Sequence, residues 1–232
     1  MKDSRINLIE VPEKGEALVI TDLHGNLDDY RKYESIWKLW DLNESHVIIT
    51  GDFIHPAGYY FDGSIEILES LMDYHQNYQN FHVLLGNHEW CQLISQPIYK
   101  LGVDQAWDFQ RKVQKRFTDF YKDKLREYNK FFRELPIAMK TDNRILVSHA
   151  GPSTFVKSID DLIKINTETF NPILDDMLWR PHYDFAAEDI HSFLNRIECN
   201  VHIVGHTPVN GFKITGEKCS YYRPVIVLEG KH

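Results

Sequence analysis

Cysteine is scarce in this sequence, whose only three cysteines are Cys91, Cys199 and Cys219. An odd number of cysteines at such wide spacings fits neither a disulfide framework nor a CxxC zinc site, so we expect reduced thiols in a cytoplasmic protein. Long apolar runs are missing as well: none reaches the length of a membrane span, and the N-terminus lacks the apolar core of a signal peptide. The sequence therefore predicts no membrane partner.

Positive charge is also in short supply. The 232 residues include 26 Lys and Arg against 34 Asp and Glu, which gives a formal net charge of −8. This balance argues against broad, sequence-independent binding of nucleic acid, which needs a basic surface. It leaves an anionic substrate open, because bound cations can reverse the local field. Hydrophobic residues make up 43% of the chain, enough for a sizeable core, so a disordered chain is excluded.

Five short apolar runs each end in a polar or glycine-rich cluster. The runs are rich in Val, Ile and Leu, which is typical of strands covered on both faces. Helical patterns lie between them, for example at residues 27–42 and 64–76. This alternation predicts an α/β architecture. With their clusters, the runs are residues 17–25, 46–53, 81–89, 144–151 and 201–208.

The longest gap between these runs has aromatic and apolar residues at three- and four-residue spacing, which predicts an amphipathic helix or helix pair. Such an element either covers core aromatics with a solvated face or shapes access to a substrate. We therefore predict a single domain over residues 1–232, with a helical insertion at about 92–135. At the other end of the chain, residues 224–229 are expected to form a final strand, preceded at 211–222 by a shortened strand and turn.

The polar residues that follow the five runs are candidate metal ligands. Sites in α/β sheets collect at the carboxyl ends of strands, so these side chains are expected to converge. Oxygen and imidazole ligands without thiolate suit Mn, Fe or Zn. A carboxylate such as Asp52 can bridge two cations, and two close cations can clamp both reacting oxygens of a phosphoryl transfer. The candidate set is Asp22, His24, Asp52, Asn87, His149 and His206.

Magnitudes favour metals for such a reaction. Accelerations of phosphate-monoester hydrolysis reach on the order of 10²¹, whereas positioned acid–base catalysis typically contributes about 10² to 10⁴. Charge neutralisation by metal ions can supply much of the difference.

The order of the motifs resembles the calcineurin-like metallophosphoesterase superfamily, and most closely its phosphoprotein phosphatase branch with its small bacterial members. The motifs are DLHGN (22–26), GD (51–52), GNHE (86–89), SHAG (148–151) and GHTP (205–208). The stretches 135–151 and MLWRP (177–181) resemble further segments of that branch, and Pro208 stands where other branches carry a second histidine ligand. The resemblance implies two mixed β-sheets packed as a sandwich and flanked by helices, four layers in all.

The resemblance also implies roles for individual residues. One divalent metal ion would be held by Asp22, His24 and Asp52, and a second by Asp52, Asn87, His149 and His206. Mn²⁺ is expected, with Fe or Zn as alternatives. His88 is expected to protonate the leaving alkoxide, while a metal-bridging water or hydroxide attacks. Asn87 is also expected to contact the substrate.

The sequence departs from the family pattern just after the GD motif. The family carries an Asp-Arg-Gly triplet there, in which the Asp orients the catalytic histidine and the Arg grips the phosphate. Here the triplet is His55, Pro56 and Ala57. His55 either hydrogen-bonds His88 or the substrate, or is a plain loop histidine. Arg180 is the best remaining phosphate clamp, because guanidinium matches phosphate bidentately, unless it forms a surface salt bridge instead. His182 and Tyr183 follow it and could reach the same crevice.

The leading hypothesis is a phosphomonoesterase that acts on a phosphoprotein or a small phosphorylated metabolite. A phosphodiesterase or a dinucleoside-polyphosphate hydrolase would share the metal core and differ in the substrate walls. Outside enzymes, the alternatives are a noncatalytic interaction scaffold and a helix-rich α/β binding protein.

Overall fold

The first part of the chain alternates strands and helices and forms a three-stranded sheet. We describe a computed structural model that covers residues 6–12, 15–58, 60–100 and 102–207, and the backbone of 212–215 and 225–228. The strands β2 (Ala17–Ile20), β3 (His46–Ile49) and β4 (Phe81–Val83) pair in that order and are parallel throughout. Helix α1 (Leu27–Trp37) connects β2 to β3, and α2 (Ser64–Asn77) connects β3 to β4. A helix between each pair of strands returns the chain to the same end of the sheet, which makes the pairing parallel.

A second, six-stranded sheet combines an early strand with the C-terminal half of the chain. Its order is β1-β7-β8-β9-β11-β10. The β7–β8 and β10–β11 pairs are antiparallel, and the other three pairs are parallel, so this sheet is mixed. Its strands are β1 (Leu8–Val11), β7 (Ala138–Thr141), β8 (Ile145–Ser148), β9 (Val201–Val204), β10 (Phe212–Thr215) and β11 (Val225–Leu228).

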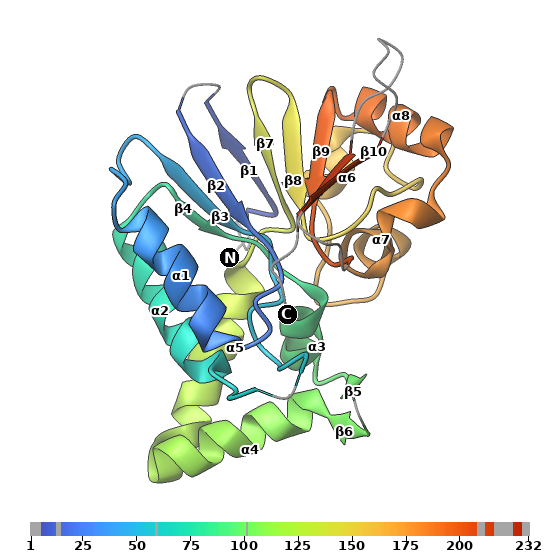
Figure 1. Ribbon diagram of the computed structural model, residues 1–232. Coiled ribbons are helices and arrows are strands. Elements are labelled where there is room, and N and C mark those ends of the chain that lie inside the picture. The colour runs from blue at the N-terminus through green and yellow to red at the C-terminus, as the bar shows by residue number, and fades with distance from the viewer. Residues whose placement is uncertain are drawn as a thin grey trace, which may run out of the picture.

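The two sheets face each other across a small apolar layer. Val11, Met139 and Val147 of the larger sheet pack with Ile48 of β3 and Leu84, which follows β4. Helices cover the outer faces, with α1 and α2 on the smaller sheet and α7 (Pro172–Trp179) and α8 (Ala187–Arg196) on the side of the larger one (Figure 1). The predicted α/β architecture of two sheets flanked by helices is thus confirmed, with one correction: the smaller sheet is parallel, not mixed.

Aromatic packing holds α1 and α2 on the smaller sheet. The ring of Trp37, fully buried at the end of α1, lies 5.6 Å from Tyr74 of α2 and 5.5 Å from Phe81 of β4, edge to face in both cases. Asn26 caps the N-terminus of helix α1, since its side-chain oxygen accepts from the Asp29 backbone N–H at 3.2 Å. On the larger sheet, the Phe193 ring of α8 contacts the His202 ring of β9 at 5.5 Å. The helices on that side are α6 (Ile159–Ile163), α7 (Pro172–Trp179), η2 (His182–Asp184) and α8 (Ala187–Arg196).

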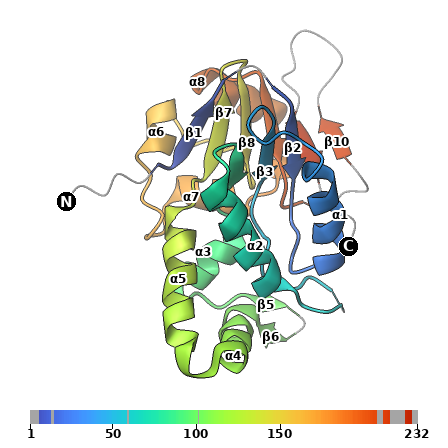
Figure 2. The same ribbon diagram turned by 90° about the vertical axis from the view of Figure 1, so that its left-hand side faces the viewer.

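The segment predicted as a helical insertion contains two long helices that form a hairpin at one end of the molecule (Figure 2). Phe109 of α4 and Tyr128 of α5 are buried, whereas Trp107 and Phe120 are 53% and 70% exposed. A short β-hairpin, which periodicity does not predict, lies between α3 and α4. The elements are α3 (Asn87–Ile94), β5 (Tyr99–Lys100), β6 (Val103–Asp104), α4 (Gln105–Phe117), η1 (Thr118–Phe120) and α5 (Tyr121–Glu134).

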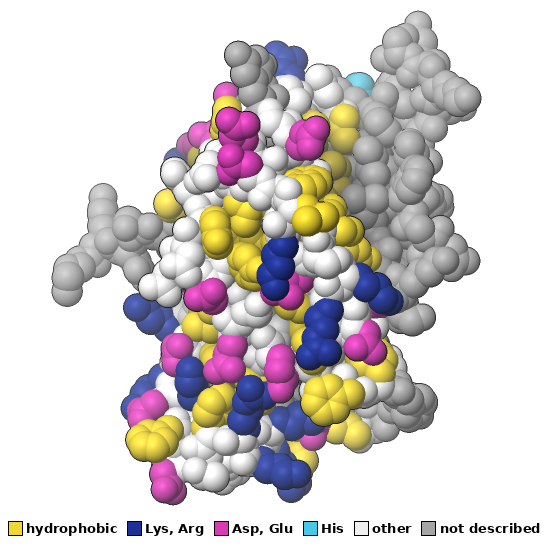
Figure 3. Space-filling view, turned by 60° about the vertical axis from the view of Figure 1, so that its left-hand side comes forward, with side chains coloured by type: hydrophobic (Ala, Val, Ile, Leu, Met, Phe, Trp, Pro, Cys, Tyr) yellow, Lys and Arg dark blue, Asp and Glu magenta, His cyan; other side chains and the backbone are white. Residues whose placement is uncertain are grey.

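Ion pairs tie the insertion to α2. Arg116 of α4 pairs with Glu66, and Lys124 of α5 pairs with Glu69 at 3.4 Å. Figure 3 shows Lys and Arg side chains interspersed with Asp and Glu over this face of the molecule. The alternation of charge in the sequence is therefore a solvated helix face with local pairing. That residues 1–232 are one domain with an insertion at about 92–135 stays a prediction.

Three smaller expectations have different outcomes. All four residues of β3 are buried, as predicted for a strand covered on both faces, but Ala17 of β2 is exposed because β2 is an edge strand. The final strand is present as β11, and β10 precedes it. Pro208 and Cys219 lie outside the described residues.

Within the described ranges, no helix is long and apolar enough to cross a membrane.

Candidate metal centre

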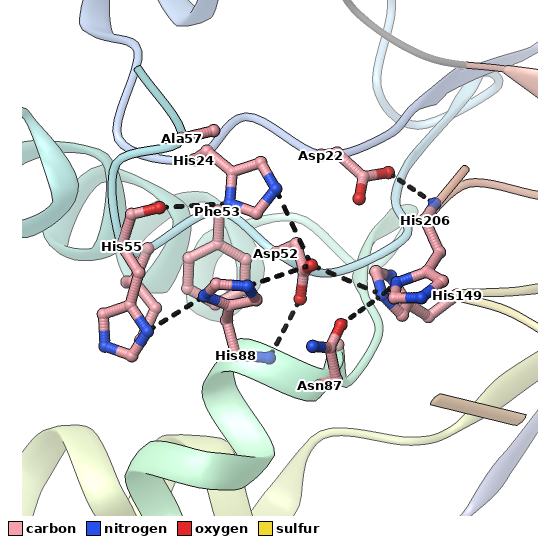
Figure 4. Close-up of polar contacts among 12 residues, drawn as sticks. Asp22, His24, Asp52, Phe53, His55, Ala57, Asn87, His88, His149 and His206 are labelled. Atoms are coloured by element: carbon pink, nitrogen blue, oxygen red, sulfur yellow. Dashed lines mark hydrogen bonds and ion pairs between the residues drawn. The ribbon is translucent and has the colours of Figure 1, made fainter. Parts of the chain in front are cut away.

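The six candidate ligands lie at the carboxyl ends of five strands. Asp22 and His24 follow β2, Asp52 follows β3, and Asn87 begins α3 after β4. The larger sheet supplies the other two ligands, one after β8 and one after β9, and these are His149 and His206. Figure 4 shows the side chains gathered around the Asp52 carboxylate. All five motifs therefore converge beside the carboxyl ends of strands from both sheets.

The Asp52 carboxylate is common to two groups of potential ligands. Asp22, Asp52, His149 and His206 have ligand atoms within 4.8 Å of one another, and so do His24, Asp52 and His88. The Oδ2 atom of Asp52 lies 3.8 Å from His24 Nε2 and 3.5 Å from His149 Nε2. By these distances Asp22 groups with His149 and His206, and its Oδ2 also accepts the His206 backbone N–H at 2.8 Å. A carboxylate shared in this way is positioned to bridge two cations.

Hydrogen-bond acceptors, whose lone pairs can bind a cation, converge in the first of these groups. The terminal amide atom of Asn87 that faces the group lies 2.9 Å from His149 Nε2, 3.2 Å from His206 Nδ1 and 3.0 Å from Asp52 Oδ2. The two imidazole nitrogens are 3.1 Å apart. Turned with its NH₂ group inward, the amide can donate to these neighbours. With its oxygen inward, four acceptors point at one place, an arrangement that a cation satisfies. The residues present therefore fit a metal site.

Backbone carbonyls fix two of the histidines in the tautomer that metal binding needs. His24 Nδ1 donates to the His55 carbonyl at 3.0 Å, and His149 Nδ1 donates to the Thr50 carbonyl at 3.1 Å. A neutral imidazole that donates from Nδ1 keeps a lone pair on Nε2. In both residues Nε2 is the nitrogen that faces Asp52. Such carbonyl contacts are the usual support for metal-binding histidines.

Burial sets the charge states of these groups. It lowers the pKa of His149 and of His206 to about 3, so both imidazoles are neutral with free lone pairs. It raises the pKa of Asp52 to about 7, because the carboxylate loses its water, although the hydrogen bond from the His88 backbone N–H acts in the opposite direction. A positive charge between these groups would stabilise the ionised carboxylate and use the neutral nitrogens. The electrostatics therefore agree with a cation site.

Glu89 holds the Asp52 loop in place, a role that the sequence analysis did not assign. Its side chain is fully buried and accepts four backbone N–H groups. Oε2 accepts from Asp52 at 2.8 Å and Gly86 at 3.2 Å, and Oε1 accepts from Phe53 at 3.0 Å and Ile54 at 3.2 Å. Burial beside Asp52 raises the pKa of Glu89, and the N–H groups oppose that shift. A glutamate three residues after the residue that precedes a helix is a capping signature, which is the local signal for this role.

The loops of the site are strained and closely packed. Four site residues have left-handed backbone conformations: His24 (φ 45°), Asp52 (52°), His55 (65°) and His206 (64°). Such conformations are uncommon outside glycine, and they cluster at functional sites. Gly86 allows the close approach of two of these loops, because a Cβ there would overlap the backbone and carboxylate of Asp52.

His55 contacts the candidate proton donor. Its Nδ1 lies 3.1 Å from Nδ1 of His88, and its side chain is buried. Burial lowers the pKa of His55 to about 4, and burial together with neighbouring histidines lowers that of His88 well below its usual value. Of the alternatives for His55, the structure places it against His88. It is not among the residues that line the cavity described next.

A cavity of about 380 Å³ opens over the ligands. Arg180, the predicted phosphate clamp, is not among its lining residues, and neither are His182 and Tyr183. Arg180 instead pairs with Asp176 at 3.4 Å, and its guanidinium lies 4.2 Å from the ring centre of Phe185. The lining consists of His24, Asp52, Ala57, Asn87, His88, Ile98, Tyr99, Lys100, Trp179 and His206.

Comparisons with known proteins agree with this geometry. A family model described as calcineurin-like phosphoesterase matches residues 16–210. A serine/threonine-protein phosphatase from Caenorhabditis elegans is 24% identical over 153 residues, which are 64% of this chain and 29% of that protein. The chain thus matches less than a third of the length of this curated relative.

Solved structures share the fold at low identity. A serine/threonine phosphatase from Saccharomyces cerevisiae aligns with a TM-score of 0.71 at 16% identity, over 97% of this chain and 71% of that one. A cold-active protein-tyrosine phosphatase from a psychrophilic Shewanella aligns with a TM-score of 0.68 at 18% identity, over 97% and 74%. At such identities the likeness establishes the fold alone.

Proposed function

Because the chain belongs to the calcineurin-like phosphoesterase family, we propose that it is a metal-dependent phosphomonoesterase. The observation that best supports this proposal is that two groups of potential ligands share the Asp52 carboxylate. Within each group, the ligand atoms lie within 4.8 Å of one another. Two cations that share Asp52 would be held by Asp22, His24, Asp52, Asn87, His149 and His206. Mn²⁺ is the expected metal. When bound, such a pair neutralises the phosphate and lowers the pKa of a water nucleophile.

The remaining chemistry belongs to side chains around that centre. His88 lines the cavity, and its Nε2 lies 3.9 Å from Asp52 Oδ2 while Nδ1 faces His55. Nε2 is therefore the nitrogen that can hold a proton toward a leaving alkoxide. His55 would orient the ring through Nδ1, in the place of the aspartate that the family pattern has at this position. Positioned acid catalysis of this kind typically contributes about 10²- to 10⁴-fold.

The cavity walls suit an ester with an apolar or aromatic leaving group. Ile98, Tyr99 and Trp179 line the cavity beside the ligands, together with Ala57. The substrate would be a phosphoprotein side chain or a small phosphorylated metabolite. The walls beyond the ligands, rather than the metal centre itself, would distinguish a phosphomonoester from a phosphodiester or a dinucleoside polyphosphate.

Hydrolysis of model esters tests the proposal. We expect no turnover of p-nitrophenyl phosphate after chelation, and recovered turnover when Mn²⁺ is restored. Absence of metal-dependent turnover with both p-nitrophenyl phosphate and bis-p-nitrophenyl phosphate would refute an enzymatic role and favour a noncatalytic scaffold. Faster turnover of the diester would refute the monoesterase assignment.

A further inference from the structure

The cavity lacks the arginine that the family pattern has in the middle of its Asp-Arg-Gly triplet. Pro56 occupies that position, and a proline side chain has no hydrogen-bond donor. Arg180 is engaged elsewhere: its Nη1 donates to Asp176 Oδ1 and its Nη2 donates to the Asp184 carbonyl, both at 3.4 Å, while the guanidinium covers Phe185. A phosphate in the cavity would therefore need another source of positive charge.

Among the described residues, the lining of this cavity contains one lysine or arginine side chain, that of Lys100. It lies in the same lining as Asp52, Asn87 and His88. Its ammonium interacts electrostatically with both Asp52 and His88. No feature of the local sequence around residue 100 marks it as a site residue, because it comes from the short hairpin rather than from a strand-end motif.

The hairpin that carries Lys100 is anchored on both sides. Lys100 of β5 pairs with Val103 of β6, and Tyr99 pairs with Asp104. The Gln105 backbone N–H donates to the Ile98 carbonyl at 2.8 Å, which closes the base of the hairpin. Asp104 then caps α4 by accepting from the Ala106 backbone N–H at 3.1 Å. Lys100 thus extends from a paired strand joined to a long helix, which limits its positions over the cavity.

On these grounds we propose that Lys100 binds the phosphate oxygens of the substrate and takes the place of the missing arginine. The proposal rests on the phosphomonoesterase function above. A lysine ammonium is a compact charge with three donors and binds phosphate well, although without the bidentate geometry of guanidinium. The neighbouring Ile98 and Tyr99 line the same cavity, so one hairpin would contact both the phosphate and the group attached to it.

Substitution of Lys100 tests this assignment. In Lys100→Met, which keeps an unbranched side chain one atom shorter and removes the charge, we expect KM for p-nitrophenyl phosphate to rise by about 10- to 100-fold, with a smaller change in kcat. The affinity of the Mn²⁺-loaded protein for inorganic phosphate, measured by calorimetry, should fall by a similar factor. Lys100→Arg should keep both values within about threefold of the wild type, because it retains a cation at that position.

Two further variants make the result specific. Lys115→Met removes an exposed lysine on α4 outside the cavity lining and is expected to leave KM and phosphate affinity unchanged. Arg180→Met tests the competing clamp and should have a smaller effect on phosphate affinity than Lys100→Met. Thermal melts of each variant separate loss of folding from loss of binding.

The outcomes distinguish this proposal from the function on which it rests. Phosphate affinity within twofold of the wild type in Lys100→Met, or a larger loss in Arg180→Met, would overturn the role of Lys100. Wild-type protein that binds phosphate through Lys100 but hydrolyses neither ester would support the binding role and refute the phosphomonoesterase function.

Discussion

Replacing Glu89 by Gln is expected to destabilise the protein and to displace the Asp52 carboxylate. Each oxygen of Glu89 accepts two backbone N–H groups, from Asp52 and Gly86 on Oε2 and from Phe53 and Ile54 on Oε1. Glutamine has nearly the same shape but only one oxygen. Whichever way its amide turns, the NH₂ group faces two backbone donors, and those donors lose their acceptor in a fully buried place.

The magnitude follows from the two orphaned donors. Leaving a buried donor unsatisfied costs about 1–3 kcal/mol, so two of them cost about 2–6 kcal/mol. Typical domains are stable by only about 5–15 kcal/mol, and the substitution therefore removes a large part of the total. Because two of the four donors belong to Asp52 and its neighbour Phe53, the loop that carries the candidate bridging carboxylate should relax as well.

Urea unfolding of the chelated protein measures the loss of stability. Mn²⁺ titration by calorimetry measures the effect of the displaced Asp52 carboxylate on metal affinity. Glu134→Gln is a matched control, because Glu134 is exposed at the end of α5 and its contact with Lys130 is long, at 3.9 Å. We expect that variant to change the unfolding free energy by less than about 0.5 kcal/mol. If Glu89→Gln were equally neutral in stability and in Mn²⁺ affinity, the account of Glu89 as the support of this loop would be wrong.

Three other substitutions have expected outcomes. Asp52→Asn should lose bound Mn²⁺ and turnover together, as elemental analysis and ester hydrolysis would report, and full retention of both would exclude the bridging role. His55→Asp should raise the pKa of His88, which burial now holds well below its usual value, because a carboxylate favours the imidazolium; the alkaline limb of the kcat–pH profile should move up by about 1 unit, and an unmoved limb would contradict this. Burial and the nearby His46 lower the pKa of His82 to about 4, so His82 is protonated less readily in the folded chain than in the unfolded chain. Stability should therefore fall by up to about 3 kcal/mol as the pH drops from 6.5 to about 4, and His82→Gln should flatten that slope in urea unfolding.

The position of the site could be predicted from the sequence because its signal is local. Each ligand follows an apolar run within a few residues, and parallel strands bring their carboxyl ends to one edge. The run that contains His149 illustrates this: strand β8 ends at Ser148, and the next residue lies in the site. The convergence of Asp22 with His206, 184 residues apart in the chain, follows from that rule.

The features that the sequence did not reveal depend on contacts between distant segments. Strand β1 (LIEV) is too short to have a clear pattern, and its pairing with β7 joins residues about 130 positions apart. The sequence left the contact of His55 with His88 as one of several alternatives, and the left-handed backbone at His55 is a conformation that no residue type at that position announces. Lys100 comes to the cavity on a hairpin of two-residue strands. Local periodicity contains no information about such placements.

The division of the ligands between two sheets has a thermodynamic consequence. Asp52 and Asn87 extend from the smaller sheet, and His149 and His206 extend from the larger one. A cation held by all four would cross-link the sheets, and it could do so only in the folded chain. Its binding free energy would then add to the unfolding free energy, by about 2.7 kcal/mol at a free metal concentration of 100 times Kd. The supply of metal would thus govern how long the folded protein persists as well as how fast it works.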